Sequence, residues 1–220
     1  MNNEQVDKAL RIACGHDELR PVMSTPFSCN GWNMATDAHV ILAVKGEPMY
    51  ARIESKAAKP IDERCAEWAE RVHTPARDMT ITAEQVREAM SQWPMVDDYN
   101  EVECSECNGS GSVECECHCG DQHDRDCDKC KGAGSFKSEV PSGKIPHPAE
   151  KVSTGGFAAF GPQTWPKLAL IVEALDIKEL RVTNGSNNGM VRMEAVDMPV
   201  VLVLMPVMTY ANEKFFYTIP

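Results

Sequence analysis

The fold is decided by the stretch ATDAHVILAV, residues 35–44, in which a polar turn signal leads into an unbroken apolar run. Such a run of aliphatic residues predicts a buried strand. A similar stretch, AVDMPVVLVL, spans residues 195–204 and repeats the alanine, aspartate, valine and leucine at the same positions. We interpret the two stretches as a pseudo-repeat with an offset of 160 residues, and chance similarity between two β-rich segments is the alternative.

Similar elements flank the two stretches. Before the first, an amphipathic pattern predicts a helix over about residues 3–14, and Asn30-Gly31 predicts a hairpin turn within residues 21–45. Before the second, a helix is expected over about 164–175 with Pro166 in its first turn. Strands are then expected at 179–183, 189–194 and 199–205. A Glu-Leu-Arg triplet follows each helix, at 18–20 and at 179–181.

The residues between the two stretches predict an insertion. One helix is expected at about 61–73, and another begins at Thr82, where Thr-Ala-Glu-Gln forms a capping box. We therefore expect an α+β fold, in which two helix-plus-sheet halves form one domain around an inserted helical and zinc-binding module. The expected segments are the first half (1–45), the helical insertion (46–100), the zinc-binding module (101–137), a connector (138–151) and the second half (152–220).

A pair of glycine-rich cysteine knuckles carries the strongest chemical signal. CSECNGSG (104–111) and CDKCKGAG (127–134) are two copies of Cys-x-x-Cys-x-Gly-x-Gly. Two cysteines three apart on a tight turn can present both thiolates to one ion, and the distance between the copies suits a tetrahedral zinc site. We predict structural zinc there, with buried or disulfide-linked cysteines as the alternative. The predicted ligands are Cys104, Cys107, Cys127 and Cys130.

The segment between the knuckles, CECHCGDQH (115–123), offers ligands for a second ion. Three cysteines and two histidines suffice for one, although their irregular spacing leaves the ligand set open. The set that we prefer is Cys115, Cys117, Cys119 and His123, with His118 either exposed or hydrogen-bonded to a ligand. The expected cofactor is therefore zinc, with one ion at the knuckles and a candidate set for another.

The charge of the chain limits its partners. With 33 acidic and 22 basic residues, the net charge of −11 argues against a general nucleic-acid coat, because such a coat binds by neutralising phosphates. Residues 101–130 hold nine acidic side chains against Arg125 and Lys129, so this module should repel DNA. No window reaches the roughly 18 to 20 apolar residues of a membrane span, and the first residues lack a signal-peptide pattern, so we expect a cytoplasmic protein.

The knuckles resemble the cysteine-rich domain of DnaJ-type chaperones over about 31 residues. This resemblance implies a zinc-stabilised hairpin and a protein-binding surface. It does not imply chaperone activity, because the His-Pro-Asp motif of a J-domain does not occur in the sequence.

Both ends of the chain resemble the sliding clamp, which is the β subunit of bacterial DNA polymerase III. ELRP (18–21) and NMATDAHVILA (33–43) are similar to the family's Leu-Arg-Pro and Ala-Thr-Asp-Gly-His-Arg-Leu-Ala segments, with Val40 in the place of the arginine. VLMPVM (203–208) looks like its carboxy-terminal Val-Met-Pro-Met strand. The matching parts, about 1–45 and 152–210, correspond to one clamp domain where a clamp subunit has three.

In that family these segments line a hydrophobic pocket for linear peptide motifs of polymerases and repair proteins. Methionine gives such a pocket an adaptable apolar wall. In true clamps the two segments come from adjacent domains, so we expect a pocket here to need self-association or a different geometry. For Met205, Pro206 and Met208, the alternative is that they are ordinary core and strand-end residues. By resemblance, the pocket residues are Thr36, Ala38, His39, Ile41, Met205, Pro206 and Met208.

A clamp also encircles DNA and lines the hole with helix residues. By resemblance, Lys8, Arg11 and Lys167 are candidate lining residues, and ordinary solvated helix faces explain them equally well. One clamp-like domain with a knuckle insertion further resembles small phage-encoded proteins.

We therefore expect a non-enzymatic, sliding-clamp-like accessory protein of DNA replication that binds zinc and replication or repair proteins and assembles as a homo-oligomeric ring on DNA. The alternative is a zinc-dependent adaptor or inhibitor of host replication or repair proteins without DNA contact. A third hypothesis is an enzyme that uses a metal held between the knuckles. No nucleophile elbow, phosphate loop or metalloprotease helix occurs in the sequence, so no catalytic residue is predicted.

Overall fold

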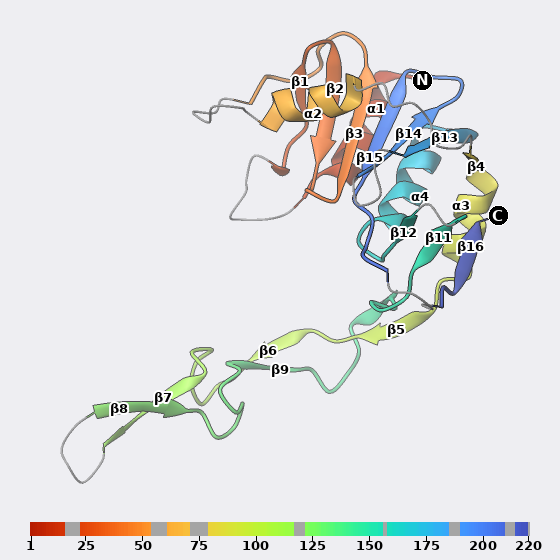
Figure 1. The fold of residues 1–220 in the computed structure, drawn as a ribbon. Helices are drawn as coiled ribbons and strands as arrows, with labels where there is room; N and C mark the ends of the chain where they lie inside the picture. The colour runs from red at the N-terminus through yellow and green to blue at the C-terminus, as the bar shows by residue number, and fades with distance from the viewer. Residues whose placement is uncertain are drawn as a thin grey trace. The chain divides into compact units, whose positions relative to one another are not determined.

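The computed structural model describes residues 1–15, 23–53, 61–70, 79–116, 122–155, 158–184, 190–209 and 214–219. The chain divides into two compact units, drawn in Figure 1. We call residues 1–93 with 148–220 the body, and residues 94–147 the cysteine unit. Three sequence features fall outside the described residues: the first Glu-Leu-Arg triplet, the end of the helix expected to reach residue 73, and the segment with Cys117, His118 and Cys119.

The body is built on a seven-stranded sheet with the strand order β1-β2-β3-β15-β14-β13-β4. Every neighbouring pair in this sheet is antiparallel. Three strands from the start of the chain therefore continue directly into three from its end, so that the two halves share one sheet as expected. The strands are β1 (Phe27–Cys29), β2 (Trp32–Thr36), β3 (Val40–Lys45), β15 (Val200–Leu204), β14 (Val191–Ala195), β13 (Glu179–Asn184) and β4 (Met79–Thr82).

The central pair, β3 with β15, has the register of a local two-fold axis. Leu42 is paired with Leu202, which is its own counterpart in the pseudo-repeat. To either side, Val40 pairs with Leu204 and Val44 with Val200, as two equivalent antiparallel strands require. The sequence pseudo-repeat is therefore a repeat in the fold, and each copy covers a sheet edge that the other would expose.

Both faces of the sheet are covered by helices (Figure 1). On β3, Leu42 belongs to the larger core, to which α1 (Asn3–Ala13) and α4 (Trp165–Ala174) contribute. Its neighbour Ile41 belongs to a second core with α2 (Ile61–Glu70). Successive residues of a strand point to opposite faces, so a strand covered on both faces must be apolar throughout. This explains the unbroken apolar runs in the two repeated stretches.

Local signals in the sequence place the turns and helix starts. Asn30 and Gly31 have φ values of 53° and 77°, so the β1–β2 hairpin turn needs two residues that tolerate the left-handed region. α1 begins with a capping box between Asn2 and Gln5. α3 (Ala83–Ser91) begins with the expected box, in which Thr82 caps the backbone of Gln85.

Residues 46–93 form part of the body, whereas the sequence suggested an insertion. β4 pairs with β13 at the edge of the central sheet, and α3 packs against α4. Ile81 and Val86 are completely buried in the larger core. β4 has only four residues, so its periodicity cannot be distinguished from that of a loop. A small second sheet completes the body, with the order β12 (Ala158–Phe160), β11 (Val152–Thr154), β16 (Tyr217–Ile219).

The cysteine unit consists of two-stranded ribbons. β5 (Met95–Asp98) pairs with β10 (Gly143–Pro146), β6 (Glu101–Glu103) with β9 (Ser135–Lys137), and β7 (Ser112–Glu116) with β8 (Gln122–Asp126). Within the described part of this unit, the buried apolar cluster is made by the four knuckle cysteines with Val113 beside them. Ribbons of two strands are marginally stable alone, so the buried cysteine cluster is the main source of tertiary packing in the described part of this unit.

None of the helices in the described ranges combines the length and apolarity that crossing a bilayer demands.

Candidate functional site

The two knuckles bring four cysteine sulfurs to one point. The sulfurs of Cys104, Cys107, Cys127 and Cys130 all lie within 4.8 Å of one another, and all four residues are buried. The Sγ–Sγ distance is 3.7 Å for Cys104–Cys127 and for Cys107–Cys130. A disulfide would need a separation of about 2.05 Å, so these are free thiols.

The geometry of the four sulfurs fits a tetrahedral metal ion. Zinc–thiolate bonds of about 2.3 Å place the sulfurs of a regular tetrahedron roughly 3.8 Å apart, close to the observed pairs. The four cysteines can therefore hold one metal ion, and with four protein ligands that ion would have no open position for a substrate.

Backbone hydrogen bonds support the sulfurs symmetrically. The N–H of Gly111 donates to Cys107 Sγ over 3.3 Å, and the N–H of Gly134 donates to Cys130 Sγ over 3.2 Å. Across the knuckles, Cys104 N donates to Gly134 O and Cys127 N to Gly111 O, both over 2.8 Å. The two copies are thus related by a pseudo-two-fold axis through the cysteine cluster. Such N–H donors stabilise thiolates and orient them toward a metal.

The second glycine of each knuckle leaves no room for a side chain. A Cβ added at Gly111 would lie 2.3 Å from Gly132 O, and one at Gly134 would lie 2.3 Å from Gly109 O. Both glycines also have positive φ, at 80° and 77°. The motif needs glycine here because the two knuckle backbones touch, in addition to the turn geometry expected from the sequence.

The cysteine thiols ionise unequally. Burial acts to raise the pKa of Cys104, but backbone hydrogen bonds from Cys107 and Glu106, together with the neighbouring thiols, lower that pKa to about 7. For Cys127, a backbone hydrogen bond from Cys130 lowers the pKa, but burial and the thiols of Cys104 and Cys130 raise it to about 11. Two sulfurs that share a proton titrate in this stepwise way. A bound cation would favour the thiolate form of both.

The second predicted ligand set is placed only in part. Cys115 and His123 are Cα partners across β7 and β8, directly opposite each other. Their side chains, and residues 117–121 with Cys117 and Cys119, lie outside the described part of the chain. A second metal ion therefore stays a prediction.

In the body, four of the predicted pocket residues line one apolar cavity. Thr36, Ala38, His39 and Ile41 surround a volume of about 160 Å³. Val203 of β15 contributes to the same wall. Helix α2 closes another side of the cavity with Ile61, Arg64, Cys65 and Trp68, and Met23 and Met190 complete the lining.

His39 also borders a second cavity, which contains the other predicted segment. This cavity of about 330 Å³ is lined by His39, Met205 and Pro206 among others. The N–H of Met205 donates to the carbonyl of His39 over 2.8 Å, so the two segments meet within one chain. Self-association is not needed to bring them together. Met208 lines neither cavity and is 80% exposed.

A network around Asp37 shapes the turn that carries His39. One carboxylate oxygen of Asp37 accepts hydrogen bonds from the N–H groups of His39 and Val40, each over 2.8 Å. The other oxygen accepts from Lys167 of α4, which also donates to the carbonyl of Cys14 over 3.0 Å. The carboxylate is therefore occupied by the turn and by α4. Between Asp37 and His39, Ala38 has a φ of 75°, a conformation that normally favours glycine.

The candidate DNA-lining residues lie on α1 and α4, which form a helix layer together with α3. Arg11 forms an ion pair with Asp7 over 2.8 Å, and Lys167 is paired with Asp37, while Lys8 is exposed. These three helices together carry five acidic and four basic side chains. The layer therefore has no excess of positive charge for DNA phosphates.

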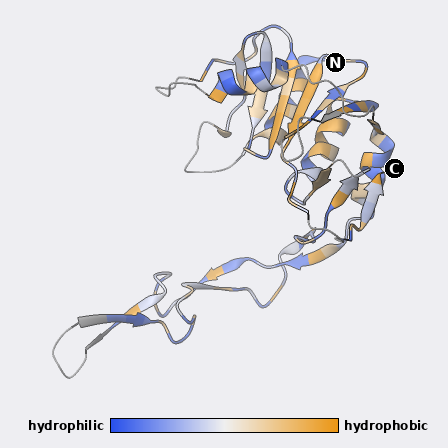
Figure 2. Ribbon diagram, in the orientation of Figure 1, coloured by the Kyte–Doolittle hydropathy of each residue, from blue (hydrophilic) through white to orange (hydrophobic). Residues whose placement is uncertain are grey.

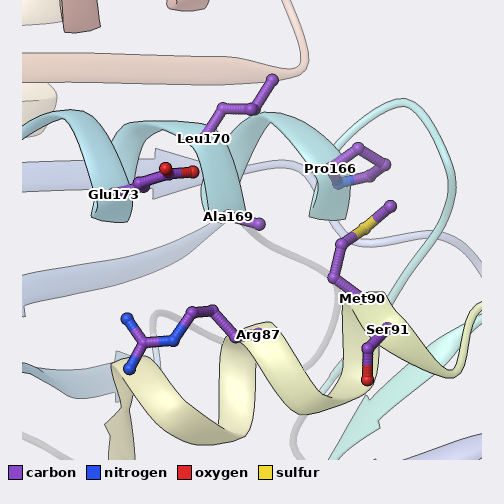
Figure 3. Close-up of a pocket in the computed structure, with 7 residues that line it drawn as sticks. All are labelled: Arg87, Met90, Ser91, Pro166, Ala169, Leu170 and Glu173. Atoms are coloured by element: carbon purple, nitrogen blue, oxygen red, sulfur yellow. The ribbon is translucent and has the colours of Figure 1, made fainter.

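The same helix layer contains an apolar groove between α3 and α4, shown in Figure 3. Met90, Pro166, Ala169 and Leu170 line this groove of about 320 Å³, and Leu170 is 51% exposed. Arg87 of α3 and Glu173 of α4 lie toward one end (Figure 3). An apolar surface of this kind suits contact with protein better than contact with phosphate.

Sequence reasoning missed the contribution of α2 to the cavity at His39. The stripe of Ile61, Cys65 and Trp68 predicts a helix with a buried face, and the structure confirms that helix. No sequence signal says which part of the sheet such a face covers. Its place over the His39 turn follows only from the tertiary packing.

No family model and no curated protein sequence matches the chain. Solved structures of bacterial sliding clamps are similar to it. The DNA polymerase III β subunit from Thermotoga maritima has a TM-score of 0.47 at 10% identity, with 94% of this chain and 63% of that chain covered. The DNA polymerase sliding clamp from Bacillus subtilis has a TM-score of 0.44 at 11% identity, with 94% and 62% covered. The chain thus spans less than two thirds of the length of these clamps.

Proposed function

We propose that this chain is a non-enzymatic, clamp-like accessory protein that captures a linear peptide segment of a replication or repair protein at the two cavities beside His39. The observation that supports it is the hydrogen bond from Met205 N to His39 O, which joins the two segments singled out for peptide capture. Residues far apart in sequence thereby lie next to each other, and His39 lines both cavities.

The chemistry of the surface favours an extended peptide with two apolar side chains. The cavity beside α2 is small, at about 160 Å³, and is lined by Ile41, Trp68 and Val203 among others, which suits one aliphatic or aromatic side chain. The cavity beside Met205 and Pro206 is larger, at about 330 Å³, and has room for a second side chain. His39 borders both cavities.

A binding measurement tests this function. A fluorescent peptide with leucine and phenylalanine anchors is titrated with wild-type protein and with Trp68→Ala and Met205→Ser. Each substitution is expected to weaken binding by about tenfold or more, since apolar anchors dominate such interfaces. Val196→Ser, an exposed change between β14 and β15, is the matched control and should leave the affinity unchanged. Equal affinity of all four proteins, with unchanged melting temperatures, would rule out the proposed pocket.

We further propose that the four knuckle cysteines bind one zinc ion with a purely structural role, as in the hairpin of a DnaJ-type zinc module. Thiolate-only tetrahedral sites are typical of structural zinc. Mass spectrometry of the native protein, with metal analysis, should give at least one zinc per chain. Loss of that zinc from a Cys104→Ser, Cys127→Ser double variant, but not from Cys14→Ser, would assign it to the knuckles.

A second candidate function is an adaptor or inhibitor that binds replication or repair proteins without touching DNA. The specific observation in its favour is the charge of the helix layer, which carries five acidic and four basic side chains. Duplex DNA binding at low salt, together with the particle mass in solution, separates the two candidates. A ring of several chains that retains DNA supports the clamp, and a monomer without DNA affinity supports the adaptor.

A further inference from the structure

We propose that the cysteine unit is a second docking surface, on which the β6–β9 ribbon receives a protein segment that is both apolar and basic. Val102 of β6 and Phe136 of β9 are Cα partners, so their side chains belong to the same face of the ribbon. They are 43% and 37% exposed. This site is separate from the peptide surface of the body and does not depend on it.

The opposite face of the same ribbon is polar. There Glu101 is paired with Lys137 and Glu103 with Ser135. The ribbon is therefore amphipathic. The side chains of its apolar pair are partly exposed to solvent. Lys129 places its ammonium 5.8 Å from the centre of the Phe136 ring and donates to Ser105 Oγ, which holds that ring in place.

Exposed apolar side chains are concentrated in this unit. Among the described residues, ten large hydrophobic side chains are exposed, and five of them lie in residues 94–147, about a quarter of the chain. Besides the ribbon pair these are Met95, Val140 and Ile145. Figure 2 shows hydrophobic segments within this otherwise hydrophilic part of the chain. Scattered single residues of this kind are ordinary, but the paired side chains of Val102 and Phe136 lie side by side and can form one contact surface.

Charge decides what kind of partner fits. Residues 94–147 contain twelve acidic and five basic residues, so they carry most of the net charge of −11. Four thiolates around one dication would add two further negative charges. Phosphate backbones, anionic lipids and a second copy of this unit would all be repelled. A cationic protein segment with apolar side chains complements the exposed apolar pair of the ribbon and the net negative charge of the cysteine unit.

The test uses three fluorescent peptides of equal length, one with alternating Leu and Lys, one with Leu and Glu, and one with Ser and Lys. The zinc-loaded full chain is expected to bind the Leu/Lys peptide at least about tenfold more tightly than the other two. Phe136→Ser and Val102→Ser should each remove most of this preference. Zinc content is measured for every variant, so that a lost surface is distinguished from a lost fold.

Val196→Ser is the matched control, because Val196 is similarly exposed, at 44%, but lies on the body. Three results would overturn the proposal: Ser/Lys peptide binding as tight as Leu/Lys binding, unchanged affinity of zinc-loaded Phe136→Ser, or an equal loss in the Val196→Ser control. Trp68→Ala should leave Leu/Lys binding intact. If Trp68→Ala abolished it, the peptide would be bound by the body, and the inference about the ribbon would fail while the proposed pocket would stand.

Discussion

The body and the cysteine unit share a two-copy arrangement, but different interactions hold the copies together. Each is made of two similar copies facing each other across a two-fold axis, with an offset of 160 residues in the body and 23 between the knuckles. In the body the copies meet through buried aliphatic side chains such as Leu42 and Leu202. In the cysteine unit they meet through four sulfurs and two touching glycine turns. Removal of metal and removal of apolar volume should therefore damage different parts of the molecule.

The largest expected effect is a loss of structure in the cysteine unit that leaves the body unchanged. Cys104→Ser should abolish metal binding and the fixed structure of the cysteine unit, because structural zinc contributes about 10–16 kcal/mol to the folding of comparable small modules. The body should keep its melting temperature, since its core contains none of the four ligands. Metal analysis and amide NMR spectra check both statements, with Ser105→Ala as the control. A reduced, metal-free protein whose cysteine unit stayed folded would contradict the comparison.

The converse change acts at the centre of the body. Leu202→Ala removes a completely buried side chain from the two-fold axis and should lower the free energy of unfolding by about 2–5 kcal/mol. The zinc content should not change. Denaturant unfolding measures the loss, and Leu170→Ala, on the exposed side of α4, should stay within about 0.5 kcal/mol of wild type. A loss of zinc in Leu202→Ala would show that the two regions are coupled.

A single methyl group sharpens the comparison inside the cysteine unit. Gly134→Ala places a Cβ 2.3 Å from Gly109 O at a positive φ, and it disturbs an N–H that donates to Cys130 Sγ. Zinc affinity should fall by about 10- to 100-fold, the range found when groups that support metal ligands are lost. Competition with a chelator measures it. Gly143→Ala in β10 is the control, because nothing lies within 4 Å of its added Cβ.

The smallest expected effect concerns the turn at His39. Ala38→Gly should raise the stability of the body by up to about 1 kcal/mol, because alanine is strained at a φ of 75°. Thermal unfolding measures the change. Asn30→Gly is the matched control, since asparagine tolerates its φ of 53° and little strain would be relieved. A destabilised Ala38→Gly protein would mean that the methyl group contributes more through packing in the cavity than it costs in strain.

Most of the body was predictable because its signals are local. The paired apolar stretches, the Asn30-Gly31 turn and the capping box at Thr82 each fix the conformation of a few neighbouring residues. The role of residues 46–93 was not predictable in the same way. β4 is too short to show a pattern, and its place beside β13 depends on the edge that the second half of the chain leaves open.

The candidate sites divide along the same line. The sequence identifies the knuckle cysteines by their spacing, and the structure brings all four together. The sequence predicts only part of the lining of the cavity at His39. Helix α2 supplies Trp68 and Arg64 to the same cavity, and no sequence pattern links that helix to the His39 turn. The sequence also gives no sign that Lys167 supports the His39 turn, because its partner Asp37 lies 130 residues away.

By itself the sequence determined the α+β class, the two-copy architecture and a set of four cysteines that could hold a metal ion. Periodicity and residue spacing encode these features within short windows of the chain. Only the tertiary structure decided that β3 pairs with β15 about their own equivalent residues, that His39 and Met205 meet in one chain, and that one ribbon face of the cysteine unit stays apolar and exposed. Those features depend on which distant surfaces bury each other, and burial is a property of the folded chain as a whole.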